Sequence, residues 1–234
     1  MYKRKESDSM EKTTTKEEGK KLYFSVNGEW DMKNFMPKGK KAILIRALEP
    51  EYEEEGIPYK IKNIDKFSNV LELYIMDIYD PDDPENVNQF EGKCKYFTEE
   101  MAVELNEFIL NNDFDEVTVH CTAGMSRSSA IAMCIARILK LEDLVVKIAN
   151  GLFTPNLAIL SVFSKIDVRY KNGFKDSDVI YRDPGRLKPI DIEEINNSVK
   201  DVFIDEDEDE ALKALKRVQK KRKEFIARIW GLKL

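Results

Sequence analysis

The residues best suited to chemistry lie together between positions 117 and 130. Cys121 follows an apolar run that ends in His120, a short loop containing Gly124 comes next, and Arg127 lies six positions after the cysteine. Apolar residues then recur at the spacing of one helix face, at Ile131, Cys134, Ile135 and Ile138. The segment is therefore predicted to be a strand, a tight loop and a helix. A thiol ends the strand and a guanidinium begins the helix.

This arrangement predicts a binding site for an anion. Loop amides around Gly124 can converge on one point, and the helix aims its unpaired N–H groups and positive dipole end at the same point. A helix N-terminus and a neighbouring cation favour thiolate over thiol, so we expect Cys121 to be a nucleophile. Arg127 offers a planar set of donors that matches two phosphate oxygens. The predicted chemistry is in-line attack of sulfur on phosphorus, with Ser128 donating a hydrogen bond to the departing sulfur.

The string from His120 to Ser128 resembles the signature loop of the cysteine-dependent protein tyrosine phosphatases. Its form, His-Cys-x-Ala-Gly-x-Ser-Arg-Ser, is closest to the dual-specificity group and its compact bacterial and viral relatives. The resemblance implies that Cys121 is the nucleophile, Arg127 the phosphate clamp and Ser128 the hydroxyl that assists thiolate departure. It implies a supporting role for His120, the only histidine in the chain. The expected substrate-binding residues are Thr122, Ala123, Gly124, Met125, Ser126 and Arg127.

A phosphate ester also needs an acid to protonate its leaving oxygen. The apolar run from Asn69 to Met76 predicts a core strand, and this strand leads into Asp77. In the family that the loop resembles, an Asp that follows a strand a few dozen residues before the cysteine is this acid, and Asp77 matches that pattern best. Asp80 is the alternative and Asp82 the third choice. The segment 80–84, with its two prolines, can also be read as a plain polar turn.

The remaining pattern predicts an α/β fold. Short apolar runs suit strands at 22–26 and 42–47. Helices are expected to open at Thr98 and at the pair Thr154 and Pro155, and another is expected over 141–150. No chemical role is expected for Asn156. The resemblance implies a central mixed sheet of about four to five strands flanked by helices, in a dual-specificity-like phosphatase fold.

Composition divides the chain into four parts: a charged arm at 1–20, a phosphatase domain at 21–166, a linker or wrapping segment at 167–204 that includes a short helix at 191–202, and a C-terminal piece at 205–234. The last part joins an acidic run to a basic amphipathic helix. We expect this helix to dock on its own domain, and the alternative is that it binds a partner, anionic lipid or nucleic acid. The net charge of −6 argues against nucleic-acid binding by the whole surface.

The chain has three cysteines and no spacing typical of a disulfide framework, which favours a reducing compartment. Cys94 is expected to be an inert thiol, although some relatives use a second cysteine to trap the oxidised nucleophile. The sequence shows no apolar run near 18 residues and no signal-peptide pattern, so we expect a cytoplasmic protein.

The expected activity is hydrolysis of phosphate from phosphotyrosine in proteins, with phosphoserine and phosphothreonine left open. No cofactor is expected, because one histidine leaves little from which to build a typical metal site. One alternative is a catalytically silent phosphoprotein-binding module of the same fold. The joint presence of Cys121, Arg127 and Ser128 argues against this alternative. The other alternative is an RNA 5′-phosphatase, and the basic C-terminal segment is the only feature that favours it.

Overall fold

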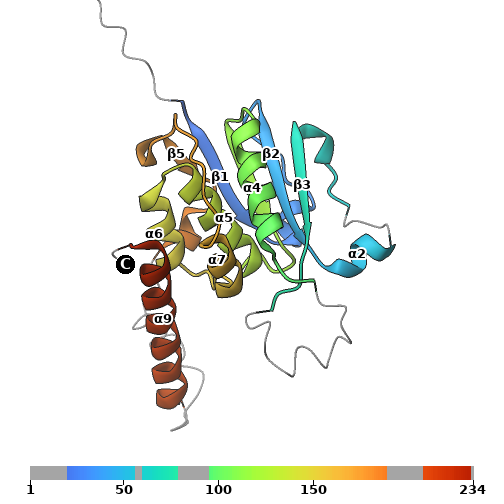
Figure 1. Cartoon of the computed structure of the whole chain (residues 1–234). Helices are drawn as coiled ribbons and strands as arrows, with labels where there is room; N and C mark the ends of the chain where they lie inside the picture. The colour runs from blue at the N-terminus through green and yellow to red at the C-terminus, as the bar shows by residue number, and fades with distance from the viewer. Residues whose placement is uncertain (1–19, 56–59, 79–94, 189–207, 233–234) are drawn as a thin grey trace, which may run out of the picture.

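Five strands form one sheet at the centre of the computed structural model, and helices pack against it (Figure 1). The structure describes residues 20–55, 60–78, 95–188 and 208–232. The strand order is β3-β2-β4-β1-β5. The strands are β1 (Leu22–Asn27), β2 (Ala42–Leu48), β3 (Asn69–Tyr74), β4 (Glu116–His120) and β5 (Val179–Tyr181).

Every strand pairing in this sheet is parallel, so the expectation of a mixed sheet is wrong, while the expected α/β class is confirmed. Successive strands are joined by helical or long connections rather than tight hairpins, and only such connections return the chain to the edge where a parallel strand begins. All strands therefore end at the same edge of the sheet. Glu49, Asp77 and Cys121 come after the three neighbouring strands β2, β3 and β4 at this edge.

The seven described helices are α1 (Glu29–Met32), α2 (Pro50–Glu55), α4 (Glu99–Asn111), α5 (Arg127–Ile138), α6 (Glu142–Asn150), α7 (Leu157–Phe163) and α9 (Glu208–Trp230). Three short 3-10 turns join them: η1 (Ile64–Lys66), η2 (Asp176–Asp178) and η3 (Pro184–Leu187). Every residue of α5 except Arg137 is buried, because it packs on the sheet and against α4, α6 and α7. No helix in the described ranges is long and apolar enough to cross a membrane.

Each face of the sheet has its own core. Along β2 the side chains alternate: Ile43 and Ile45 join the large core, and Leu44 joins a smaller one with Met32 and Phe67. All of β2 is buried, as expected of a central strand in a parallel sheet covered on both faces. This packing fixes the ends of β2 and β4, and therefore the residues that follow them.

The sequence predicted a helix N-cap at Thr98 and another at Thr154, and the structure supports the first. Thr98 is the N-cap of α4, where its side chain accepts from the Met101 amide, as expected. The expectation that Thr154 and Pro155 open a helix is wrong, because α7 begins at Leu157. Asn156 is its N-cap and accepts from the amides of the second and third helical residues. Residue 154 is held outside the helix, since its amide donates to the Met125 carbonyl (3.1 Å).

After α7 the chain wraps back across the domain and adds an edge strand. The strand β5 pairs with β1 in parallel register over Leu22 to Phe24. The sequence predicted no strand in this segment. The charged arm at 1–19 and the short helix expected over 191–202 lie outside the described residues.

The C-terminal half of α9 packs against the domain beside α6 and α7 (Figure 1). Ile226 is fully buried and Trp230 is 5% exposed, both within the large core. The Arg137 guanidinium lies 5.3 Å from the centre of the Trp230 ring and donates to the Trp230 carbonyl (3.3 Å). Between residues 217 and 230, where the side chains of this helix are described, the exposed ones are mainly cationic: Arg217, Lys220, Lys221 and Arg228.

We expect Trp230→Ala to lower the free energy of unfolding by about 3–5 kcal/mol, the usual cost of removing a buried large aromatic side chain. Urea denaturation followed by circular dichroism measures this change. The matched control is Val218→Ala on the same helix, where the side chain is 51% exposed and we expect a change within about 0.5 kcal/mol. Equal stabilities for the two variants would mean that α9 does not dock in solution.

Candidate active site

The loop between β4 and α5 holds the residues that the sequence singled out. It packs against the end of β1, where the Glu29 amide donates to the Thr122 carbonyl (3.0 Å). Gly124 has φ +72°, and a Cβ there would lie 2.4 Å from the Gly28 nitrogen. Only glycine fits this approach, because a side chain would meet backbone that cannot move aside. The loop therefore has one closely fixed shape.

The Cys121 sulfur lies at the floor of this loop. Its residue is 1% exposed, and the Gly124 amide donates to Sγ (3.3 Å). As a thiol, Cys121 donates to Ser128 Oγ at 3.2 Å. As a thiolate it would instead accept from the same hydroxyl, so the predicted pairing of Ser128 with the sulfur matches the geometry.

Arg127 begins α5 and is 3% exposed. Its guanidinium donates from Nη1 to the Ile75 carbonyl (2.7 Å) and from Nη2 to Thr122 Oγ1 (3.1 Å). Nη2 also forms an ion pair with Glu49. The Nε–H group is buried and has no acceptor among the described residues. A buried donor without an acceptor is costly, so this edge of the guanidinium is where an anion would be stabilised most.

A row of polar side chains crosses the sheet beneath the loop. Arg46 lies between its register partners His120 and Glu72, donates from Nε to His120 Nε2 (3.2 Å) and forms an ion pair with Glu72. Burial, and next the Arg46 charge, lower the pKa of His120 to about 3. The imidazole is therefore neutral and cannot act as an acid or base near neutral pH. A hydrogen bond to Glu72 is the main cause that raises the pKa of Tyr74 to about 12.

Asp77 reaches the loop from the end of β3. Its Oδ1 accepts from Ser126 Oγ (2.6 Å) and from Asn156 Nδ2 (2.8 Å). Its Oδ2 has no hydrogen-bond partner in the described part of the chain, so this oxygen is available to carry a proton. Asp80 and Asp82, the other expected acids, lie outside the described residues, as does Cys94.

Asn156 contacts the candidate acid, Asp77, which the sequence analysis did not predict. The side chain is fully buried. It caps α7 through its oxygen and holds Asp77 and the Ile78 carbonyl through its nitrogen. The nearby Phe153 carbonyl accepts from Arg222 of α9 (3.4 Å). Asn156 therefore links the candidate acid to the start of α7.

Two carboxylates at the loop were not predicted either. Glu49 Oε1 accepts from Thr122 Oγ1 (3.1 Å) as well as from Arg127. Glu29 is the first residue of α1; burial and then the charge of Glu49 raise its pKa, while Arg127 opposes them. Both follow strands whose ends meet Cys121 at one edge of the parallel sheet, so their place at the loop depends on a strand pairing that the sequence did not predict.

The other loop residues differ in exposure. Thr122 and Ala123 are exposed, Met125 is partly buried against the core, and Gly124 and Ser126 are buried. Thr122 and Ala123 are thus the side chains that a bound molecule would meet first. In the described part of the chain, no group of three His, Cys, Asp or Glu residues could hold a metal ion.

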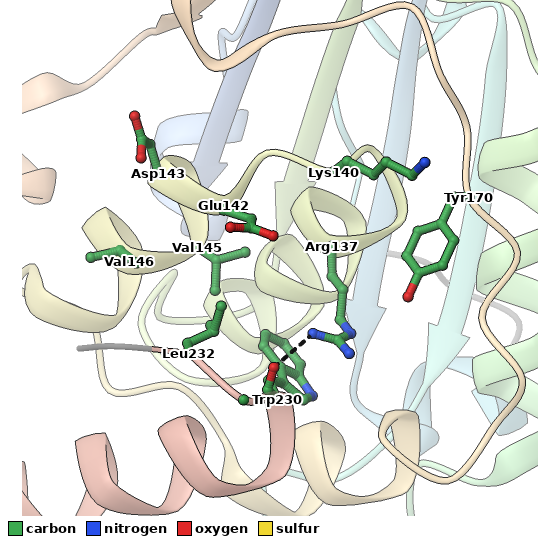
Figure 2. A pocket seen from close by; sticks show the side chains of 10 residues that line it. Arg137, Lys140, Glu142, Asp143, Val145, Val146, Tyr170, Trp230 and Leu232 are labelled. Carbon is green, nitrogen blue, oxygen red and sulfur yellow. Dashed lines mark hydrogen bonds between the residues drawn. The ribbon is translucent and has the colours of Figure 1, made fainter.

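A cavity of about 680 Å³ lies elsewhere, between the ends of α5, α6 and α9 (Figure 2). Its walls include Arg137, Lys140, Glu142, Tyr170 and Trp230, and it shares no residue with the loop. The candidate site is therefore the loop and its surrounding polar groups. No family model, curated protein or solved structure matches this chain.

Proposed function

We propose that this protein hydrolyses phosphate monoesters through a phosphocysteine intermediate. Its proposed substrates are phosphotyrosine side chains of proteins, with phosphoserine and phosphothreonine as further candidates. The observation that carries the proposal is the buried Nε–H group of Arg127, which has no acceptor in the described part of the chain. Arg127 is the first residue of α5, and the loop before this helix surrounds the Cys121 sulfur. Both features suit a bound phosphoryl group.

In the first step the Cys121 thiolate attacks phosphorus, and an S–P bond forms as the P–O bond to the leaving group breaks. Arg127 and the loop amides hold the three phosphoryl oxygens as their charge develops. Asp77 gives its proton to the leaving oxygen, so an alcohol or phenol departs. The two donors on Oδ1 fix the carboxyl against the loop and leave Oδ2 for this transfer.

In the second step water attacks phosphorus and the S–P bond breaks. Asp77, now ionised, takes a proton from that water, and inorganic phosphate forms. The sulfur leaves as a thiolate, which the Ser128 hydroxyl at 3.2 Å stabilises. His120 remains neutral throughout, so its part is to hold the end of β4 through Arg46.

The direct test is turnover of p-nitrophenyl phosphate by the full chain, with and without EDTA. We expect hydrolysis at the same rate in both, because the nucleophile is a thiolate. Loss of turnover on chelation would favour a metal hydrolase instead. Binding of a phosphotyrosine peptide without any turnover would favour a silent phosphate-binding module.

A further inference from the structure

A buried arginine lies beneath the candidate site, in the middle of the sheet. Arg46 belongs to the central strand β2 and is 1% exposed. It contacts its register partners on both sides: Nε donates to His120 Nε2 in β4 (3.2 Å), and Nη1 forms an ion pair with Glu72 in β3. A buried ion pair rarely adds stability compared with apolar side chains of similar size. Stability alone is therefore a weak reason for a charge at this position, and the contact with His120 is a stronger one.

The contact with Arg46 decides which nitrogen of His120 carries the proton. The imidazole is neutral, so it has a single N–H group. Because Nε2 accepts from Arg46, the proton lies on Nδ1. The Nδ1–H group is buried and has no acceptor within hydrogen-bonding geometry among the described residues. In the described part of the chain, the hydrogen bond from Arg46 is thus the one that fixes this tautomer.

The end of β4 is held from both of its neighbours in the sheet. His120 is the last residue of this strand and is fully buried, and Cys121 follows it directly. On the β1 side the Cys121 amide donates to the Asn27 carbonyl (3.3 Å). On the β2 side Arg46 holds the His120 ring. These two contacts limit how far the strand end can shift, and with it the sulfur that must attack phosphorus in line.

We infer that Arg46 is a positioning residue, which holds His120 as its Nδ1–H tautomer and thereby fixes the strand end from which the Cys121 sulfur projects. This inference rests on the proposed function and adds to it a residue that touches neither the substrate nor the reacting atoms. The part of Arg46 that matters is the N–H donor to Nε2. A lysine at this position can supply such a donor, whereas a methionine of similar length cannot.

The chain has one histidine, so its imidazole can be followed by ¹⁵N NMR in the full-length protein. For the wild type we expect the long-range ¹⁵N–¹H pattern of an Nδ1–H tautomer. This pattern should not change between about pH 5 and pH 8, because the pKa of His120 is about 3. Arg46→Met should move the proton to Nε2 in a measurable fraction of molecules, and Arg46→Lys should keep it on Nδ1. The Glu72 side chain is 30% exposed, so water can solvate its carboxylate in Arg46→Met and the variant should fold.

Steady-state kinetics separate positioning from binding. In Arg46→Met we expect kcat for p-nitrophenyl phosphate to fall about tenfold while KM stays within about threefold, because Arg127 and the loop amides still bind the phosphoryl group. Arg46→Lys should restore kcat to within about threefold of the wild type. The matched control is Glu116→Gln, which removes another buried charge, at the first residue of β4, where it pairs with Arg182. It should lower stability and leave both kcat and the tautomer unchanged.

The two measurements can fail separately. An Nε2–H tautomer in the wild type, or an unchanged tautomer in Arg46→Met, overturns the inference whatever the turnover. A wild-type kcat in an Arg46→Met protein whose proton has moved to Nε2 also overturns it, as does an equal fall in kcat in Glu116→Gln. If the wild-type chain hydrolyses no phosphate ester, the proposed function fails, and the positioning role fails with it.

Discussion

The Cys121→Ser variant is expected to lose turnover of p-nitrophenyl phosphate by at least about 10⁴-fold, the scale seen when a covalent nucleophile is removed. The only histidine cannot activate a serine hydroxyl at this position, because its pKa of about 3 makes it a very weak base and its Nε2 already accepts from Arg46. Steady-state kinetics measure the loss. Phosphate binding should persist, since Arg127 and the loop amides are unchanged, and fluorescence titration with a phosphotyrosine peptide measures it.

Cys134 provides the matched control. This thiol is fully buried in α5, and burial raises its pKa well above the ordinary value. It is therefore an inert core side chain, and Cys134→Ala should keep turnover within about threefold while lowering stability modestly. A Cys121→Ser protein that hydrolyses as fast as wild type would exclude the phosphocysteine route. So would a rapid-quench experiment on the wild type that finds no phosphate attached to residue 121.

The parts of the fold that follow local patterns were predictable from the sequence. The apolar run before Cys121 and the helical spacing after Arg127 are signals read over a few residues, and both elements form where they were expected. The N-cap at Thr98 is equally local. By contrast, whether strands pair in parallel depends on the length and route of each connection, so the all-parallel sheet lay beyond local patterns.

Interactions between distant residues were also beyond the sequence reading. Arg46 lies inside an apolar strand run, where its charge could have signalled a buried partner, but His120 is 74 positions away. Asn156 seemed structural, and it does cap α7, yet the same side chain holds Asp77, 79 positions away. The strand β5 has only three residues and a pairing partner near the start of the chain. None of these contacts produces a periodic pattern of residues in the sequence.

The Asp77→Asn variant is expected to lower kcat for phenyl phosphate by at least about 100-fold, the lower end for loss of a general acid. An asparagine keeps the shape and can still accept from Ser126 and Asn156 through its oxygen, so the loop should stay in place. Only the transferable proton is lost. The loss should be smaller for p-nitrophenyl phosphate, because p-nitrophenolate leaves without protonation more readily than phenolate. Steady-state kinetics with the two esters measure this difference.

Asn156→Ala separates positioning from chemistry. It removes one of the two donors to Asp77 Oδ1, and we expect it to lower kcat for phenyl phosphate about tenfold in the wild-type background. In the Asp77→Asn background it should have little further effect on kcat, because the group it positions no longer carries a proton. It should still cost about 1 kcal/mol of stability in both backgrounds, through loss of the α7 N-cap. Additive losses in kcat would mean that Asn156 acts on the loop directly. A near-normal kcat in Asp77→Asn together with a lowered kcat in Asp80→Asn would assign the role of general acid to Asp80 instead.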